Sequence, residues 1–125
     1  MILVDTSFLI RALVRGSSQD AKLREWLTAG EQLGMSTIVW AEFLCGPVEP
    51  HHLELVARVV PHYLPFDEPD SVLAADLFNR SGRRRGSLAD CMIAATALRA
   101  EAPLATQNVS DFRRFESAGL VVLSG

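Results

Sequence analysis

Residues 86–98 read GSLADCMIAATAL, a predicted helix with one carboxylate, Asp90, in its first turn and almost nothing polar after it. A helix that is apolar on nearly all of its faces is a buried helix. We therefore expect Asp90 to lie where the hydrophobic core meets a cleft. Ser87 and Asp90 also have the spacing of a capping box, and the helix dipole stabilises an acid at this end. Taken alone, Asp90 would be explained as a cap, so its meaning depends on the rest of the chain.

Short apolar runs alternate with helical patterns on both sides of this stretch. Strands are predicted at residues 1–4, 35–38, 63–66, 104–106 and 120–123. Helices are expected between them, including an apolar one at residues 39–45 that ends at Gly46-Pro47, and another at residues 111–118. This alternation implies βαβ units, hence an α/β fold with a parallel sheet and helices on both faces. The 125 residues fit one compact domain, residues 1–125.

The charge balance is mildly acidic, with 12 basic and 15 acidic side chains and a formal net charge of −3. Such a total does not indicate a nucleic-acid binder, although a local basic patch can coexist with it. Arg80, Arg83, Arg84 and Arg85 form such a patch. Two explanations stay open: these arginines contact an RNA backbone, or they are a solvated helix end that complements its own dipole.

The two cysteines indicate a reducing setting. Cys45 and Cys91 lie within apolar helical patterns and lack metal-ligand spacing, so we expect buried free thiols and a cytoplasmic protein. The first apolar run has no basic region before it and is too short for a signal peptide or a membrane span. We therefore expect no membrane partner.

Four acids fall at the predicted carboxyl edge of the sheet, where parallel α/β sheets bind their ligands. Asp5 follows the first strand, Glu42 lies one helical turn past the second, and Asp111 begins the helix after residues 104–106. Asp90 joins them if the preceding connection returns to this edge. Each acid has an ordinary explanation as a turn former, cap or exposed helix residue. However, Glu42 and Asp90 interrupt apolar helices and have no basic residue three or four positions away.

A cluster of carboxylates must either take up protons or bind a cation, because like charges at close range repel. Carboxylate and hydroxyl oxygens suit Mg²⁺ or Mn²⁺, whereas zinc prefers histidine or cysteine ligands. His51, His52 and His62 lack the spacing of a zinc site and are expected at the surface. An acid-only metal site favours phosphodiester hydrolysis, in which the metal activates water and neutralises phosphate charge.

Four motifs in order carry a resemblance to a known family: VDTS at residues 4–7, WAE at 40–42, LADCMIAA at 88–95 and ATQNVSDF at 105–112. Together they resemble the PIN domain, and more narrowly the VapC toxins of toxin-antitoxin pairs. The resemblance covers the whole chain. It implies a parallel sheet of about five strands, Mg²⁺-dependent RNA cleavage, homodimers, and inhibition by a cognate antitoxin protein.

The resemblance also implies roles for particular residues. The acidic positions of the family map onto Asp5, Glu42, Asp90 and Asp111 as catalytic residues, with the first, third and fourth as metal ligands. Neighbours expected to orient ligands or substrate are Thr6, Ser7, Thr106 and Asn108. The chain departs from the family at two places. Residues 87–89 hold no further acid, and Gln107 stands where a basic residue is common.

The stretch from Phe8 to Trp26 holds more large apolar residues than one small core face needs. Surplus apolar surface of this kind marks interfaces. The resemblance to the VapC toxins implies that an antitoxin segment packs there and places an arginine in the acidic site.

Three other functions remain as alternatives. A catalytically inactive PIN-like RNA- or protein-binding module should lack one of the acids, and none is missing. A metal-dependent phosphatase that acts through an aspartyl phosphate favours Asp-x-Asp after the first strand, whereas this chain has Asp5-Thr6-Ser7. A receiver-type regulatory domain would need a lysine at its phosphate site, but Lys22 is the only lysine. The sequence therefore favours a metal-dependent endoribonuclease.

Overall fold

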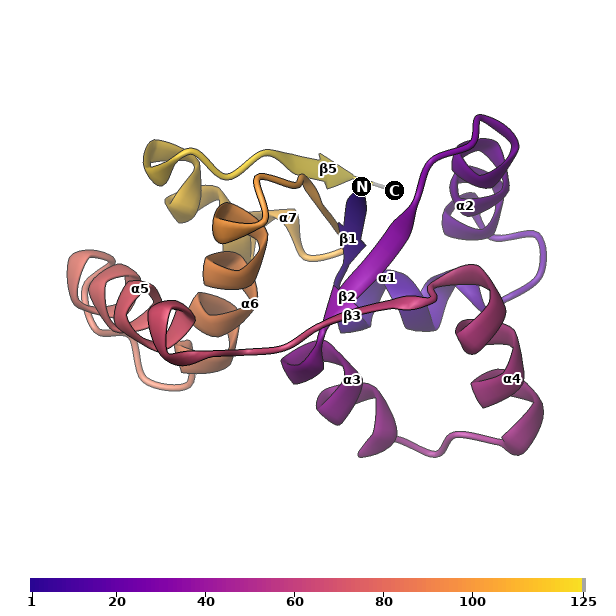
Figure 1. Cartoon of the computed structure of the whole chain (residues 1–125), viewed down its shortest axis with the longest axis horizontal. Helices are drawn as coiled ribbons and strands as arrows, with labels where there is room; N and C mark the ends of the chain where they lie inside the picture. Colours follow the sequence, from indigo (N-terminus) through magenta and orange to yellow (C-terminus); the bar gives the residue numbers. More distant parts are fainter. Residues whose placement is uncertain (125) are drawn as a thin grey trace.

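The computed structural model describes residues 1–124 and has a five-stranded parallel sheet at its centre (Figure 1). Its strands are β1 (Ile2–Val4), β2 (Leu33–Ser36), β3 (His62–Leu64), β4 (Leu104–Thr106) and β5 (Val122–Ser124). Their order across the sheet is β3-β2-β1-β4-β5, and every neighbouring pair is parallel. The α/β fold and the parallel five-stranded sheet are thus confirmed.

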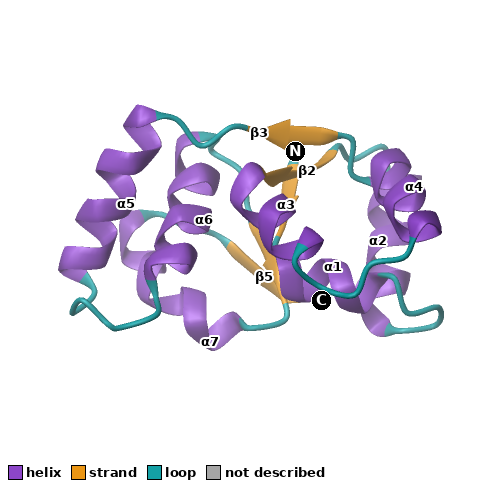
Figure 2. Ribbon diagram, turned by 90° about the horizontal axis from the view of Figure 1, so that it is seen from below, coloured by secondary structure: helices purple, strands orange, loops and turns teal. Residues whose placement is uncertain are grey.

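Helices connect the strands and lie on both sides of the sheet. They are α1 (Thr6–Ala12), α2 (Ser18–Thr28), α3 (Thr37–Leu44), α4 (Pro50–Val59), α5 (Glu68–Arg80), α6 (Leu88–Arg99), α7 (Val109–Phe112) and the 3₁₀ helix η1 (Arg113–Ala118). Figure 2 shows α5 and α6 on one side of the sheet and α1, α2 and α4 on the other. No helix within residues 1–124 has the length and apolar character needed to cross a membrane.

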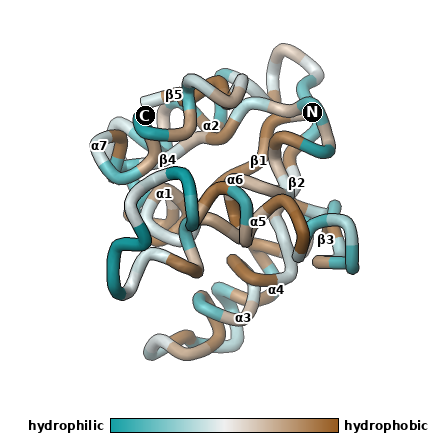
Figure 3. The backbone as a smooth tube through the Cα atoms, turned by 90° about the vertical axis from the view of Figure 1, so that its left-hand side faces the viewer, coloured by the Kyte–Doolittle hydropathy of each residue, from teal (hydrophilic) through white to brown (hydrophobic). Residues whose placement is uncertain are grey.

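The core lies between the sheet and the helices on its two faces. All residues of β1 and β4 are buried, as is expected for strands that are covered on both faces. Figure 3 shows hydrophobic segments, in brown, near the centre of the molecule. Helix α6 buries small side chains, among them Ala94, Ala95 and Ala97. It packs along α5. The prediction of a buried central helix is therefore confirmed.

The second strand and the helix after it differ from the prediction. β2 ends at Ser36, whose Oγ accepts a hydrogen bond from the backbone N–H of Val39 at 3.1 Å and so caps α3. Residues 37 and 38, predicted to be strand, therefore form the first turn of a helix. This helix is not buried throughout: Val39 and Phe43 face the core, whereas Glu42 and Cys45 are exposed. The expectation of a buried thiol is correct for Cys91 and wrong for Cys45.

The C-terminal segment also differs in detail. The predicted helix at residues 111–118 begins earlier, at Val109, and continues from residue 113 as a 3₁₀ helix. Gly119 ends it in the left-handed region, with φ of 106°, where a side chain would be strained. The chain then reverses into β5, which begins at Val122 rather than at residue 120.

Candidate active site

A cavity of about 260 Å³ lies at the carboxyl edge of the sheet. The elements around it are the end of β1, α1, α3, α6 and the segment that follows β4. Three of the four predicted acids line it, together with small polar and apolar side chains: Asp5, Thr6, Ser7, Ile10, Glu42, Asp90, Ile93, Asn108 and Phe112. Side chains far apart in the sequence therefore meet where parallel sheets bind ligands.

Asp5 is buried and held by three hydrogen bonds. Its Oδ1 accepts from the backbone N–H of Phe8 and from the hydroxyl of Ser7, both at 2.8 Å, and its Oδ2 accepts from the hydroxyl of Thr106. Burial raises the pKa of Asp5, these hydrogen bonds counteract the rise, and the charge of Glu42 adds to it. Asp5 also caps α1, so the turn-forming explanation holds for it as well. Its carboxylate is fixed in place at the floor of the cavity.

Glu42 reaches the cavity from the second turn of α3. Its Oε1 accepts a hydrogen bond from the hydroxyl of Thr6 at 2.8 Å, which joins the start of α1 to α3. The residue is exposed, so the expectation that it interrupts a buried helix is wrong. The contact with Thr6 nevertheless directs it toward the site.

Asp90 is not a helix cap. Ser87 makes no side-chain capping bond, and its hydroxyl donates instead to the backbone carbonyl of Arg84 at 2.7 Å. The capping-box explanation is therefore wrong here. Asp90 is half-buried, and its pKa rises from 3.8 to about 6, first because of burial and next because of the negative charge of Asp111. Arg114 opposes the rise, while Glu42 and Asp5 add to it.

The fourth acid stands beside the cavity rather than in its lining. Asp111 lies in the short helix α7, and its charge acts on Asp90. Arg114, two residues beyond α7, places its Nη2 atom 3.9 Å from Oδ2 of Asp90. The sequence does not single out Arg114, because nothing in the Arg113-Arg114 pair distinguishes one arginine from the other.

The loop after β4 is tied to the rest of the site. Thr106 is buried, and its hydroxyl also accepts from the backbone N–H of Asn108 at 3.0 Å. The backbone N–H of Gln107 donates to the hydroxyl of Ser7 at 3.1 Å. The side chain of Gln107 accepts a hydrogen bond from the amide of Gln19, a buried residue of α2 that sequence reasoning also missed. Gln107, which departs from the family pattern in the sequence, thus has a contact with Gln19 that positions it.

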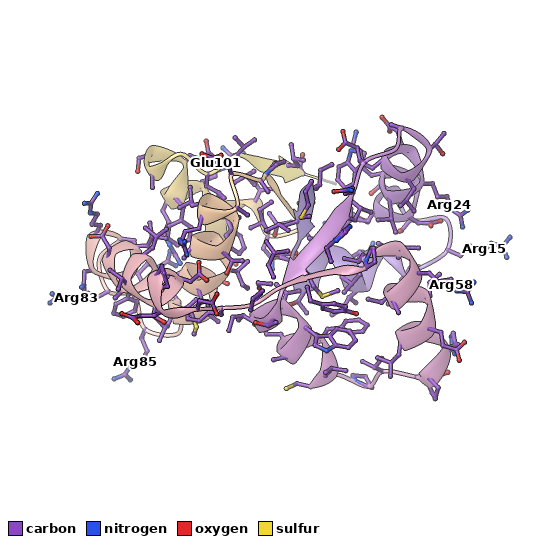
Figure 4. The ribbon with its side chains drawn as sticks, in the orientation of Figure 1. Arg15, Arg24, Arg58, Arg83, Arg85 and Glu101 are labelled. Atoms are coloured by element: carbon purple, nitrogen blue, oxygen red, sulfur yellow. The ribbon has the colours of Figure 1, made fainter. Side chains whose placement is uncertain are left out.

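The arginine patch does not reach the cavity lining. Arg83, Arg84 and Arg85 are exposed in the loop between α5 and α6, and Figure 4 shows the first and last of them pointing away from the body of the molecule. Arg83 donates from Nε to the side chain of Asn79 at 3.1 Å, and Arg80 pairs with Asp76 at 3.0 Å. Whether these residues contact RNA stays a prediction.

The donor set at this site fits Mg²⁺ in its chemistry. Within residues 1–124 no group of three or more His, Cys, Asp or Glu side chains is placed so that it could hold a metal ion. Mg²⁺ does not need such a cage, because it keeps several waters and is bound through one or two carboxylates. The lining offers oxygen ligands alone, and the raised pKa of Asp90 indicates a site that favours added positive charge.

Comparisons with known proteins agree with this architecture. The family model described as the PIN domain matches residues 2–117. No curated protein sequence matches significantly. Among solved structures, VapBC2 from Rickettsia felis bound to a promoter DNA fragment has a TM-score of 0.78 at 20% identity, covering 100% of this chain and 99% of the other.

Two further solved structures are similar along nearly their whole length. VapBC-1 from nontypeable Haemophilus influenzae has a TM-score of 0.74 at 25% identity, covering 99% of this chain and 98% of the other. VapC20 from Mycobacterium tuberculosis, described as a sarcin-ricin loop cleaving toxin, has a TM-score of 0.66 at 18% identity and covers 97% of each chain. At such low sequence identities, these structural similarities support the assignment of the fold.

Proposed function

This chain belongs to the PIN domain family, and from that premise we propose that it is a Mg²⁺-dependent endoribonuclease and the toxin of a toxin-antitoxin pair. The observation that carries the proposal is the cavity at the carboxyl edge of the sheet. Asp5, Glu42 and Asp90 line this cavity, and the charge of Asp111 acts on Asp90. The described activity of the Mycobacterium tuberculosis neighbour, cleavage of an RNA loop, supports the same class of reaction.

Each acid has a place in this reaction. Asp5, Asp90 and Asp111 would hold Mg²⁺, which when bound lowers the pKa of a water molecule and neutralises charge on the scissile phosphate. The two carboxylate oxygens of Asp5 are held by hydrogen bonds from Ser7, Thr106 and the backbone of Phe8. Glu42, with Oε1 bound to Thr6, can take a proton from the attacking water at Oε2. Asn108 lies at the same cavity, where its amide can donate to a phosphate oxygen.

The surface next to the acidic cavity suits the antitoxin. An apolar groove of about 200 Å³ runs between α1, α3 and the start of α4, lined by Ile10, Leu13, Val14, Phe43, Gly46, Pro47, Val48 and His52. Ile10 borders both this groove and the acidic cavity. Part of the predicted apolar surplus proves to be core, since Phe8, Leu9 and Leu23 are buried, while Ile10 and Val14 stay 52% exposed.

A partner segment in the groove can therefore place an arginine among the acids, where its guanidinium would displace the cation. Solved neighbours that contain an antitoxin, such as VapBC-1 from Haemophilus influenzae, support a partner of this kind. A homodimer and a cytoplasmic setting belong to the same proposal.

One assay tests the proposed activity. Purified protein is incubated with total RNA in Mg²⁺ or in EDTA, and the new RNA ends are sequenced. We expect defined cuts in Mg²⁺ alone, and their loss in Asp90→Asn. Asp76→Asn serves as the matched control, because Asp76 pairs with Arg80 on the exposed surface of α5. Full cleavage by Asp90→Asn would contradict the proposed site. RNA binding without cleavage would favour an inactive binding module. Hydrolysis of small phosphate esters would favour a phosphatase.

A further inference from the structure

Arg114 presents an unsatisfied edge of its guanidinium toward the acidic site. Its side chain is 16% exposed, and its Nε and Nη2 atoms are buried without a hydrogen-bond partner among residues 1–124. These two nitrogens form the edge that grips a carboxylate in a bidentate pair. The nearest acid to Nη2 is Asp90, whose Oδ2 lies 3.9 Å away. The gap is about 1 Å longer than a charge-assisted hydrogen bond.

The environment of Arg114 favours a carboxylate partner, because the Cys91 thiol, on which the Arg114 charge also acts, is a weak acceptor. A charged group with buried, unpaired N–H donors is costly. Packing on Phe115, whose ring centroid lies 4.6 Å from the guanidinium carbon, provides partial compensation. Pairing with Arg114 requires the Asp90 carboxylate to come closer to Nη2 than the present 3.9 Å. Arg113, the preceding residue in the same helix, is exposed and has no comparable placement.

We propose that Arg114 is a positioning residue that serves as the internal counter-charge of Asp90 and competes with the divalent cation for its carboxylate. This inference rests on the proposed nuclease function. Asp90 then has two arrangements: paired with Arg114 when the cation is absent, and turned into the cavity when it is present.

The two arrangements exclude each other, so the pairing and cation binding are linked thermodynamically. If Arg114 stabilises the cation-free arrangement, its removal must raise the affinity for the cation by the same factor. A residue that only supports the local fold would have the opposite effect, because its loss would loosen the site and weaken cation binding. The direction of the change therefore separates the two roles.

The ion pair is tested first without RNA or metal. Wild type, Asp90→Asn, Arg114→Gln and the double variant are unfolded with urea in EDTA at pH about 8. Residues in direct contact couple, so we expect the double-mutant cycle to show a coupling of roughly fivefold in the unfolding equilibrium constant. A cycle with Arg113→Gln in place of Arg114→Gln should be additive. Additive behaviour of the Arg114 cycle would overturn the pairing.

Cation binding is then measured by calorimetry with Mg²⁺ alone. We expect Arg114→Gln to bind Mg²⁺ roughly fivefold more tightly than wild type, by the linkage above. Arg113→Gln should be unchanged, and Arg114→Lys, which keeps the charge without the fork, should shift less than Arg114→Gln. Weaker binding by Arg114→Gln would overturn the competition. If wild type bound no Mg²⁺, the nuclease proposal and the proposed competition would both be wrong. The double-mutant cycle in EDTA would still show whether Arg114 and Asp90 form an ion pair.

Discussion

Asp5 and Asp90 line the same cavity but lie in different electrostatic environments. Asp5 is buried but accepts hydrogen bonds from Phe8, Ser7 and Thr106, which offset its desolvation. Among residues 1–124 no such hydrogen bond reaches Asp90, and burial together with the charge of Asp111 raises its pKa to about 6. The negative charge that the site needs is therefore destabilising at Asp90 in particular.

The raised pKa of Asp90 predicts how stability depends on pH. The folded protein keeps a proton on Asp90 up to a pKa of about 6, while the unfolded chain releases it near 3.8. Between these values the folded state binds more protons, so the free energy of unfolding falls as pH rises through this window and stays lower above it.

Asp90→Asn should lose this pH dependence. In metal-free buffer we expect the variant to gain about 1–2 kcal/mol relative to wild type between pH about 4 and pH about 8, below the full value of the shift because Asp90 is partly exposed. Urea unfolding at both pH values measures the difference. Asp76→Asn, on the exposed face of α5, should show no comparable gain. Parallel stability curves for Asp90→Asn and wild type would contradict the assignment.

At the level of elements, the sequence predicts the order and type of almost every strand and helix, because short apolar runs and their polar boundaries are local signals. The errors arise where two signals compete. Thr37 and Ile38 are β-branched and are predicted as strand, yet Ser36 caps the helix that follows. The spacing of Ser87 and Asp90 also suits a capping box, but the Ser87 hydroxyl turns to the preceding loop. Which partner a hydroxyl takes is decided by tertiary structure.

Gly34 sets how closely β2 and β3 can approach, and this holds the strand that leads into α3. A Cβ atom at Gly34 would lie 3.0 Å from the backbone carbonyl oxygen of His62 and 3.1 Å from Sδ of Met1. Gly34 also pairs with His62 in the sheet, so the carbonyl cannot withdraw without disturbing β3. Glycine is required at this position because there is no room for a Cβ atom, and not because of its backbone φ angle.

Gly34→Ala should therefore lower the free energy of unfolding by about 1–3 kcal/mol, the usual cost of overpacking a core. Chemical denaturation measures the loss. Gly46→Ala is the matched control, since its new Cβ would meet only the carbonyl oxygen of Phe43 at 3.5 Å, an ordinary contact. Equal stability of the two variants would show that β3 can shift to accept a side chain.

For the whole molecule, the sequence predicts which acids face the sheet edge but not how they are neutralised. Strand ends are local features, so Asp5 and the loop with Thr106 and Asn108 could be placed from the sequence alone. The side chains of Gln19 and Arg114 reach the site from α2 and η1 only after the chain has folded back on itself. Their roles depend on long-range packing, which no short motif records.

The acidic cavity and the apolar groove also share Ile10, and this joins the proposed catalytic and partner surfaces. Val14 lines the groove but not the cavity, so a substitution at Val14 tests partner binding without altering the acidic site. Because Val14 is 52% exposed, a charge there should leave the fold intact while placing a desolvated carboxylate under a bound apolar segment.

We expect Val14→Glu to weaken binding of the cognate antitoxin by at least about tenfold, equivalent to about 1.4 kcal/mol, while RNA cleavage by the free protein is unchanged. Calorimetry with the antitoxin and the Mg²⁺-dependent cleavage assay measure the two effects. Val72→Glu makes the same change at a valine that is 67% exposed on α5 and outside the groove, and it should alter neither. If Val14→Glu binds the antitoxin as tightly as Val72→Glu does, the partner occupies another face, and an arginine from it would have to enter the acidic cavity by a different route.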